Sequence, residues 1–310
     1  MTRIAVVFPG QGSQSIGMMA GWDDHPAVRA TFDEASEALG DDLWALVTDG
    51  PAEALNLTTN TQPVMLTAGV AAWRAWRAAG GATPDVVAGH SLGEYSALVA
   101  AGALAFKDAV PLVRFRAQAM QEAVPAGEGA MAAVMGLEPD AVHAACAEAA
   151  QGQVVEAANL NAPGQIVIAG AKAAVERASE IAKAKGAKRA VLLPVSAPFH
   201  CALMRPAAER LAERLAGVAI VKPEIDVINN VDVAVYDDPE KIRDALVRQA
   251  YSPVRWIELV QAMGARGMSH VIECGPGKVL AGMTKRIAKE VEGGSAHDAA
   301  SLEQAIAAVR

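Results

Sequence analysis

Residues 86–95 restrict the possible folds of this chain most strongly. They read Val-Val-Ala-Gly-His-Ser-Leu-Gly-Glu-Tyr: a β-branched start, a Gly-x-Ser-x-Gly turn and the beginning of a helix. This order predicts a nucleophile elbow, a tight strand-to-helix turn that leaves one serine exposed. Gly89 and Gly93 flank Ser91 because a side chain at either position would crowd the backbone. The free N–H groups of the following helix would stabilise an oxyanion beside Ser91, so we expect a catalytic serine rather than a structural one.

Strand-like and helix-like segments alternate on both sides of this turn. Hydrophobic residues make up 52% of the 310 residues and aromatic residues 4%, which suits a packed α/β protein better than a β-sandwich. The alternation predicts a mostly parallel sheet covered by helices. The expected strands cover residues 3–8 and 85–88, and the expected helices cover 60–79, 92–101 and 109–122.

The pattern changes after a Pro-Ala-Gly-Glu-Gly stretch at residues 125–129. From there the order is β-α-β-β-α-β, which is the ferredoxin-like split arrangement. We therefore expect a small subdomain over 128–194, inserted into a large α/β subdomain formed by 1–127 and 195–310. Within these parts, 160–164 is expected to be a loop between strands, 269–273 the last clear strand, and 293–298 a polar break.

A serine nucleophile needs a base, and His200 is the favoured candidate among six histidines. It lies on an irregular segment where the chain leaves the small subdomain, a place that can bring a base to a site between subdomains. His90 is adjacent to Ser91, and neighbours on an elbow point apart, so we interpret it as a packing or turn residue. No acid stands out between Ser91 and His200. A dyad oriented by a carbonyl or amide is therefore favoured over a full triad, and such a site would use water less readily.

Two arginines lie on one expected helix, Arg114 and Arg116, about 200° apart around its axis. Arg116 falls within the apolar arc that includes Val113, Ala117 and Met120, so it is the one expected to face the interior. A buried arginine needs an anion. That anion is either a carboxylate on the substrate, which a guanidinium can hold at two points, or a structural salt-bridge partner; the sequence leaves both open.

Two further segments allow more than one interpretation. The glycine-rich turn after the first strand, residues 8–14, lacks the third glycine of a dinucleotide-binding fingerprint. It can instead present a backbone N–H as the second half of an oxyanion hole, beside that of Leu92. The basic run at 183–189 is either a solvated helix end or a docking patch for an acidic partner.

Composition excludes several classes of function. The three cysteines are far apart and form neither a disulfide framework nor a zinc motif, so no metal is expected. The net charge of −8 disfavours a nucleic-acid partner. No apolar run approaches the ~18–20 residues that span a bilayer, and the amino end resembles a buried strand rather than a signal peptide. We therefore expect a cytoplasmic protein with no nucleic-acid or membrane partner.

Taken together, many collinear motifs resemble the malonyl-CoA:acyl carrier protein transacylases of fatty-acid synthesis and the related acyltransferase domains of polyketide synthases. The resemblance covers nearly the whole chain and implies a hydrolase-like core with a ferredoxin-like insert. The motifs lie at residues 8–14, 61–63, 89–98, 116–125, 159–165, 198–200, 229–231 and 273–277.

The resemblance also implies roles for individual residues. Ser91 is the implied nucleophile, and His200 the implied general base and acid. Arg116 is implied to bind the malonyl carboxylate, and the N–H groups of Gln11 and Leu92 are implied to form the oxyanion hole.

Three further positions match the family pattern. Gln249 matches the residue whose backbone carbonyl orients the histidine, which accounts for the absent acid. Asn161 matches a residue near the site. Phe199, just before the histidine, is of the type that accompanies malonyl rather than methylmalonyl selectivity in the polyketide domains.

The implied reaction is ping-pong transfer of malonyl from malonyl-CoA to the phosphopantetheine thiol of holo acyl carrier protein, through a malonyl-serine intermediate. It needs no cofactor, because the CoA thioester is itself the substrate, and the family implies a monomer. A serine esterase or thioesterase remains an alternative, in which water accepts the acyl group. A carrier-binding module without enzymatic activity is another.

Overall fold

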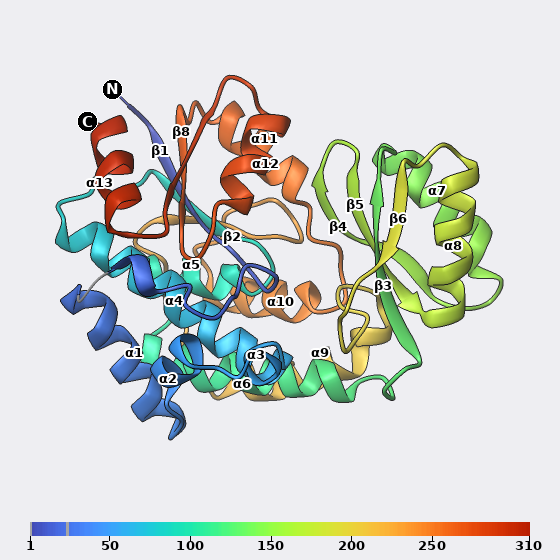
Figure 1. Cartoon of the computed structure of the whole chain (residues 1–310), viewed down its shortest axis with the longest axis horizontal. Coiled ribbons are helices and arrows are strands. Elements are labelled where there is room, and N and C mark those ends of the chain that lie inside the picture. Colours follow the sequence, from blue (N-terminus) through green and yellow to red (C-terminus); the bar gives the residue numbers. More distant parts are fainter. Residues whose placement is uncertain (1, 23–24) are drawn as a thin grey trace.

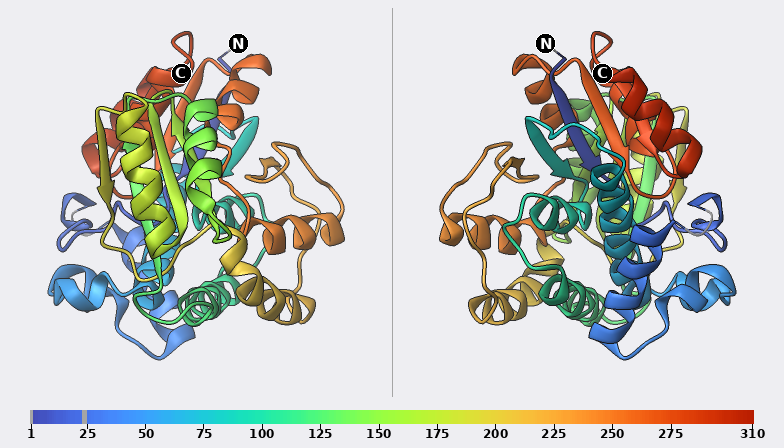
Figure 2. Two further views of the ribbon diagram at one scale, coloured as in Figure 1. Left: turned by 90° about the vertical axis from the view of Figure 1, so that its right-hand side faces the viewer. Right: turned by 90° about the vertical axis from the view of Figure 1, so that its left-hand side faces the viewer.

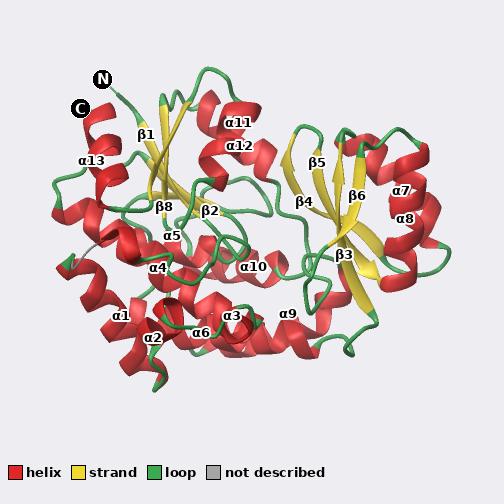
Figure 3. Ribbon diagram, viewed as in Figure 1, coloured by secondary structure: helices red, strands yellow, loops and turns green. Residues whose placement is uncertain are grey.

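The computed structural model describes residues 2–22 and 25–310, which form a larger and a smaller subdomain side by side (Figure 1). Both chain ends lie in the larger subdomain, and the smaller one is built from the middle of the chain. Figure 3 shows the strands gathered in two separate sheets. The expected α/β class is therefore confirmed. No helix in these two described ranges is long and apolar enough to cross a membrane.

The sheet of the larger subdomain has the strand order β7-β2-β1-β8-β9, and each neighbouring pair is parallel. All of β1 is buried, as expected for a parallel strand covered on both faces. The strands are β1 (Ile4–Phe8), β2 (Val86–Gly89), β7 (Asp226–Ile228), β8 (His270–Cys274) and β9 (Glu292–Ala296).

Helices cover both faces of this sheet because successive side chains of a strand point to opposite faces. On one face Val6 and Phe8 pack in the core that contains the helices before and after β2. On the other face Ala5 and Val7 pack with Trp256 and its neighbours. The helices are α1 (Pro26–Leu39), α2 (Leu43–Thr48), α3 (Ala52–Leu55), α4 (Thr58–Ala78), α5 (Gly93–Ala100), α6 (Phe106–Glu122), α9 (Arg205–Ala216), α10 (Pro239–Gln249), α11 (Trp256–Ala265), α12 (Val279–Ile287) and α13 (Ala299–Ala308). Short 3-10 helices cover Ala20–Trp22 and Ala202–Met204.

The smaller subdomain has an antiparallel sheet with the strand order β4-β5-β3-β6 and its own apolar core. Along the chain its elements follow the predicted β-α-β-β-α-β order, and all of them lie within residues 128–194. Figure 2 shows helices α7 and α8 side by side on the outer face of the sheet. The elements are β3 (Gly129–Met135), α7 (Pro139–Ala150), β4 (Val155–Ala162), β5 (Gln165–Ala171), α8 (Lys172–Ala184) and β6 (Arg189–Leu192).

Two expectations about loops were wrong. The expected loop at 160–164 is mostly strand, because β4 continues to Ala162 and pairs there with Gln165 across a tight Pro-Gly turn. The expected polar break at 293–298 contains β9, which pairs in parallel with β8 at the edge of the larger sheet. A Cβ on Gly293 would lie 2.6 Å from the carbonyl oxygen of Ala281. Gly293 therefore allows α12 to approach closely, and a Cβ on Gly294 would meet Ile272 of β8 at 2.8 Å, so these glycines mark close packing and not a break.

Candidate active site

The predicted elbow is present between β2 and α5. Ser91 has φ of 52°, a left-handed conformation that is strained for a residue other than glycine. A Cβ on Gly89 would lie 1.8 Å from the carbonyl carbon of Gly93, and a Cβ on Gly93 would lie 2.1 Å from the carbonyl oxygen of Phe8. Both positions therefore require glycine, because strand, turn and helix pass too close for any side chain.

Asn230, which follows β7, holds this strained turn in place. Its Oδ1 accepts a hydrogen bond from the N–H of Ser91 at 2.7 Å, and its Nδ2 donates to the carbonyl oxygen of Gly89 at 2.6 Å. Asn230 is fully buried. Sequence reasoning assigned no role to Asn230. Its place beside Asn229 after a strand was the signal that could have drawn attention to it.

His200 lies against the serine. The Oγ of Ser91 is 2.6 Å from Nε2 of His200, and Nδ1 of His200 is 2.9 Å from the backbone oxygen of Gln249. A carbonyl oxygen can only accept, so Nδ1 carries the hydrogen and Nε2 is free to accept the serine proton. Burial, aided by the charge of Arg116, lowers the pKa of His200 to about 3, so the imidazole is neutral at physiological pH. This is the arrangement of a serine–histidine dyad oriented by a carbonyl.

Arg116 lies inside the protein at the same place, with 1% of its surface exposed. It donates to Gln62 Oε1 at 2.8 Å, to Gln249 Oε1 at 2.9 Å and to Ser91 Oγ at 3.3 Å. Arg114 instead pairs with Asp41 near the surface, as the helical spacing predicted. Among residues 2–22 and 25–310, Arg116 has no ion-pair partner and its Nε–H has no hydrogen-bond acceptor. The salt-bridge alternative for this buried cation therefore finds no support in the described chain.

The side chain of Gln249 connects these groups, which sequence reasoning missed. Its Oε1 accepts from Arg116, while its Nε2 donates to the backbone oxygen of Ser91 at 3.0 Å and to Glu94 Oε2 at 2.8 Å. Gln62 was likewise seen only as part of a motif. Both glutamines supply neutral acceptors to the guanidinium, and so they orient its charge without cancelling it.

A cavity of about 120 Å³ opens beside these residues, between the two subdomains. Polar groups line one part of it, and methionine and aliphatic side chains line the rest. Its lining residues are Gln11, Gln62, His90, Ser91, Leu92, Arg116, Met120, Met131, Asn159, Leu193, Val195, Phe199 and His200. Within the described ranges, the backbone N–H groups of Gln11 and Leu92 donate to no other group, which leaves both free for an oxyanion.

The remaining predicted residues lie around this cavity in different ways. Phe199 and His90 line it, whereas Asn161 does not. Asn161 Oδ1 lies 2.7 Å from Nε2 of His90, whose ring packs against Trp256. Asn159, two positions earlier on β4, lines the cavity instead, and the pairing of β4 with β5 shifts between Leu160 and Ala162, around Asn161. Asn161 therefore contacts the site through His90. In the part of the chain that the structure describes, no cluster of three histidine, cysteine or acidic side chains could hold a metal ion.

Comparisons with known proteins agree over nearly the full length. The acyl transferase domain family model matches residues 5–304. The malonyl CoA-acyl carrier protein transacylases of Salmonella typhimurium and Escherichia coli are each 55% identical over 307 residues, covering 99% of this chain and 99% of theirs.

Solved structures of similar proteins also match this chain over nearly its full length. An acyl-carrier-protein S-malonyltransferase from Burkholderia pseudomallei superimposes with a TM-score of 0.98 at 64% identity, covering 99% of this chain and 100% of that one. A malonyl-transacylase solved in complex with a type II PKS acyl-carrier protein gives a TM-score of 0.97 at 53% identity, covering 99% and 100%.

Proposed function

This chain belongs to the acyl transferase domain family, and we propose that it transfers malonyl from malonyl-CoA to the phosphopantetheine thiol of an acyl carrier protein. The observation that carries this proposal is the buried guanidinium of Arg116. It has no ion-pair partner in the described residues and lies 3.3 Å from the Oγ of Ser91. An acyl group with its own carboxylate supplies the missing anion beside the nucleophile.

The first half-reaction loads the serine. Nε2 of His200 takes the proton of Ser91 as Oγ forms a bond to the thioester carbonyl carbon. The N–H groups of Gln11 and Leu92 receive the negative charge that develops on the carbonyl oxygen. When the carbon–sulfur bond breaks, His200 returns its proton to the sulfur, and CoA leaves as a thiol. The malonyl group is now an ester on Ser91.

The second half-reaction reverses these steps with a different thiol. His200 removes the proton of the phosphopantetheine thiol, and the sulfur attacks the malonyl ester. The oxyanion forms in the same hole, the carbon–oxygen bond breaks, and Ser91 regains its proton from His200. Each step moves protons and one acyl group without oxidation or reduction, so we propose that no cofactor takes part.

Arg116 holds the malonyl carboxylate through both half-reactions. One methylene separates this carboxylate from the reacting carbonyl, so the guanidinium next to Ser91 is within reach of it. The guanidinium, whose residue lines the cavity, can form the two parallel hydrogen bonds that suit a carboxylate. Burial and then the charge of Arg116 lower the pKa of His200, and a bound carboxylate offsets the second of these causes, which makes the imidazole a stronger base when malonyl is present. Phe199, which lines the cavity, is proposed to shape the acyl site directly, and Asn161 is proposed to do so through His90.

Transfer to a carrier protein and hydrolysis by water are separated by one assay. Malonyl-CoA is mixed with the protein, with and without holo carrier protein, and both malonyl-carrier and free malonate are quantified. We expect malonyl-carrier to form much faster than malonate and Ser91→Ala to abolish it. Malonate release at an equal rate without carrier would identify a thioesterase. Unchanged transfer by Ser91→Ala would point to a binding module.

We also propose that the protein acts as a monomer in the cytoplasm, which size-exclusion chromatography and fractionation would test.

A further inference from the structure

Glu94 is a buried carboxylate directly behind the elbow, and the proposed mechanism does not use it. It lies in the first turn of α5 with 2% of its surface exposed. Its Oε2 accepts two hydrogen bonds, from the N–H of Asn230 at 2.9 Å and from Nε2 of Gln249 at 2.8 Å. Burial raises the pKa of Glu94 to about 7. Placing a carboxylate here therefore costs free energy, which raises the question of what it does.

Two hydrogen-bonded connections lead from Glu94 to the reacting groups. Through Asn230 it reaches the N–H of Ser91 and the carbonyl oxygen of Gly89, which fix the strained turn. Through Gln249 it reaches the guanidinium of Arg116. One carboxylate oxygen is thus linked by a single intervening residue to both the nucleophile and the proposed malonyl-binding cation.

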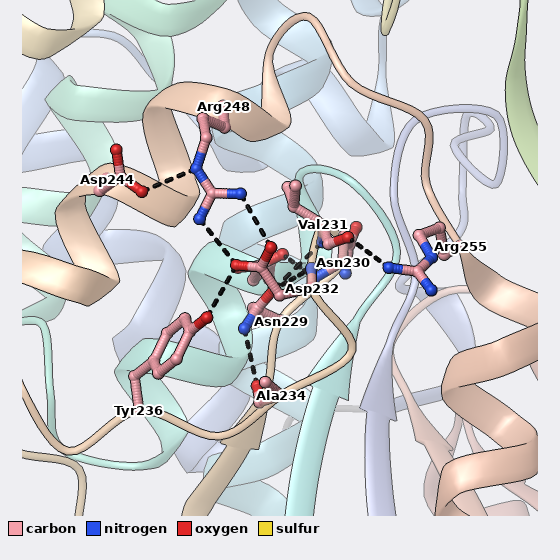
Figure 4. Close-up of polar contacts among 10 residues, drawn as sticks. Asn229, Asn230, Val231, Asp232, Ala234, Tyr236, Asp244, Arg248 and Arg255 are labelled. Carbon is pink, nitrogen blue, oxygen red and sulfur yellow. Dashed lines mark hydrogen bonds and ion pairs between the residues drawn. The ribbon is translucent and has the colours of Figure 1, made fainter.

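Both intervening residues are also held from the outside. Figure 4 shows the loop that begins at Asn229, where Oδ1 accepts from the N–H groups of Val231 and Asp232. Arg248, next to Gln249 in sequence, donates two hydrogen bonds to Asp232 at 2.9 and 2.7 Å, and Arg255 donates to the carbonyl oxygen of Val231 (Figure 4). The loop and the end of α10 are therefore joined on the outer side by an ion pair and on the inner side by Glu94.

Glu94 also helps to fix which way the Gln249 amide faces, together with the backbone oxygen of Ser91, which accepts from the same Nε2. Ionised, it can only accept, so the amide must turn its NH2 towards Glu94 and its oxygen towards Arg116. The opposite orientation would place an NH2 group against the guanidinium, donor against donor. A carboxamide at position 94 offers both an oxygen and an NH2 group, so it would leave this choice to the Ser91 carbonyl oxygen alone.

We propose that Glu94 is a positioning residue of the acyl-transfer site: by accepting from Asn230 and Gln249 at one oxygen, it aligns the elbow serine with the carboxylate-binding Arg116. This inference rests on the function proposed above. The alignment matters most for an acyl group that contacts Ser91 and Arg116 at once, as malonyl does. An acetyl group contacts the serine alone.

The test compares malonyl with acetyl transfer in Glu94→Gln. Loss of one hydrogen bond to a charged group should lower the ratio of kcat/KM for malonyl-CoA to that for acetyl-CoA by about tenfold. Glu273→Gln is the matched control, because Glu273 is also fully buried, has its pKa raised to about 7, and contacts α12 rather than the site. It should leave the ratio unchanged.

A second variant keeps the test decisive if Glu94→Gln does not fold. Gln249→Leu removes the amide but keeps the backbone oxygen that contacts His200, and it should lower the same ratio. Where Glu94→Gln does fold, combining it with Gln249→Leu should add little further loss, because its route to Arg116 is already cut. A wild-type ratio in either single variant, or an equal fall in Glu273→Gln, overturns the positioning role. A wild-type protein that does not favour malonyl overturns the proposed function itself, and this inference with it.

Discussion

Replacing Arg116 by alanine separates the two kinds of acyl group most clearly. The guanidinium lies 3.3 Å from the Oγ of Ser91, yet it takes no part in the proton transfers assigned to His200. Malonyl transfer should therefore fall sharply in Arg116→Ala, while acetyl transfer should be spared or improved. Acetyl transfer should benefit because acetyl has no carboxylate for Arg116 to bind, while the charge of Arg116 adds to burial in lowering the pKa of His200.

The size of the loss follows from the contacts. Two hydrogen bonds between a guanidinium and a carboxylate contribute about 1.5–3 kcal/mol each. Nη2 already donates to Gln249 and Ser91 in the free protein, so part of this energy replaces existing bonds and the lower end applies. About 3 kcal/mol corresponds to a loss of about 10²-fold in kcat/KM for malonyl-CoA. The variant also leaves the oxygens of Gln62 and Gln249 without their donor, at about 1–3 kcal/mol of stability each.

The assay measures transfer from malonyl-CoA and from acetyl-CoA to holo carrier protein, and far-UV circular dichroism verifies folding. Arg114→Ala is the control, because Arg114 lies on the same helix but forms a partly exposed ion pair with Asp41. Such pairs contribute about 0–1 kcal/mol, so both substrates should behave as in the wild type. Equal losses for malonyl and acetyl in Arg116→Ala would refute the carboxylate role.

Two further predictions concern stability. A Cβ in Gly89→Ala would lie 1.8 Å from the carbonyl carbon of Gly93, so the variant should fold poorly or melt at a much lower temperature. Gly282→Ala, with open space around its Cβ, should be neutral or up to about 1 kcal/mol more stable; equal thermal melts would contradict the crowding argument. Burial raises the pKa of Glu273 from 4.5 to about 7, so between these pH values the unfolded state ionises first and folding loses about 3 kcal/mol. In urea unfolding, the free energy of unfolding of Glu273→Gln should therefore rise by about 3 kcal/mol relative to that of the wild type between pH 4 and pH 8. A difference between the two proteins that does not change with pH would disprove the pKa shift.

The sequence predicted those parts of the site that depend on residues close together along the chain. The elbow is one continuous segment, so the glycines, the serine and the flanking strand and helix patterns together predict it. Arg116 was separated from Arg114 by helical spacing alone, because one face of a helix must be apolar where it packs on a core. The β-α-β-β-α-β order of the small subdomain is likewise a property of consecutive segments.

The parts that sequence reasoning missed depend on residues that meet across the fold. Asn230 contacts Ser91 over a separation of 139 residues, and Gln249 contacts Glu94 over 155. Neither asparagine nor glutamine carries a periodic signal, since a single buried amide fits any element whose neighbours satisfy it. Strand β9 was missed for a related reason: its glycines lower β-propensity, and the close approach of α12 to Gly293 is visible only in three dimensions.

The central claim is that Ser91 carries malonyl between two thiols, and intact-mass measurement of the protein tests it directly. After mixing with malonyl-CoA in the absence of carrier protein, the wild type should gain the mass of one malonyl group. The addition should disappear when holo carrier protein is supplied, and it should not form in Ser91→Ala. A wild-type protein that turns over malonyl-CoA without gaining this mass, or a Ser91→Ala variant that gains it, would contradict the account.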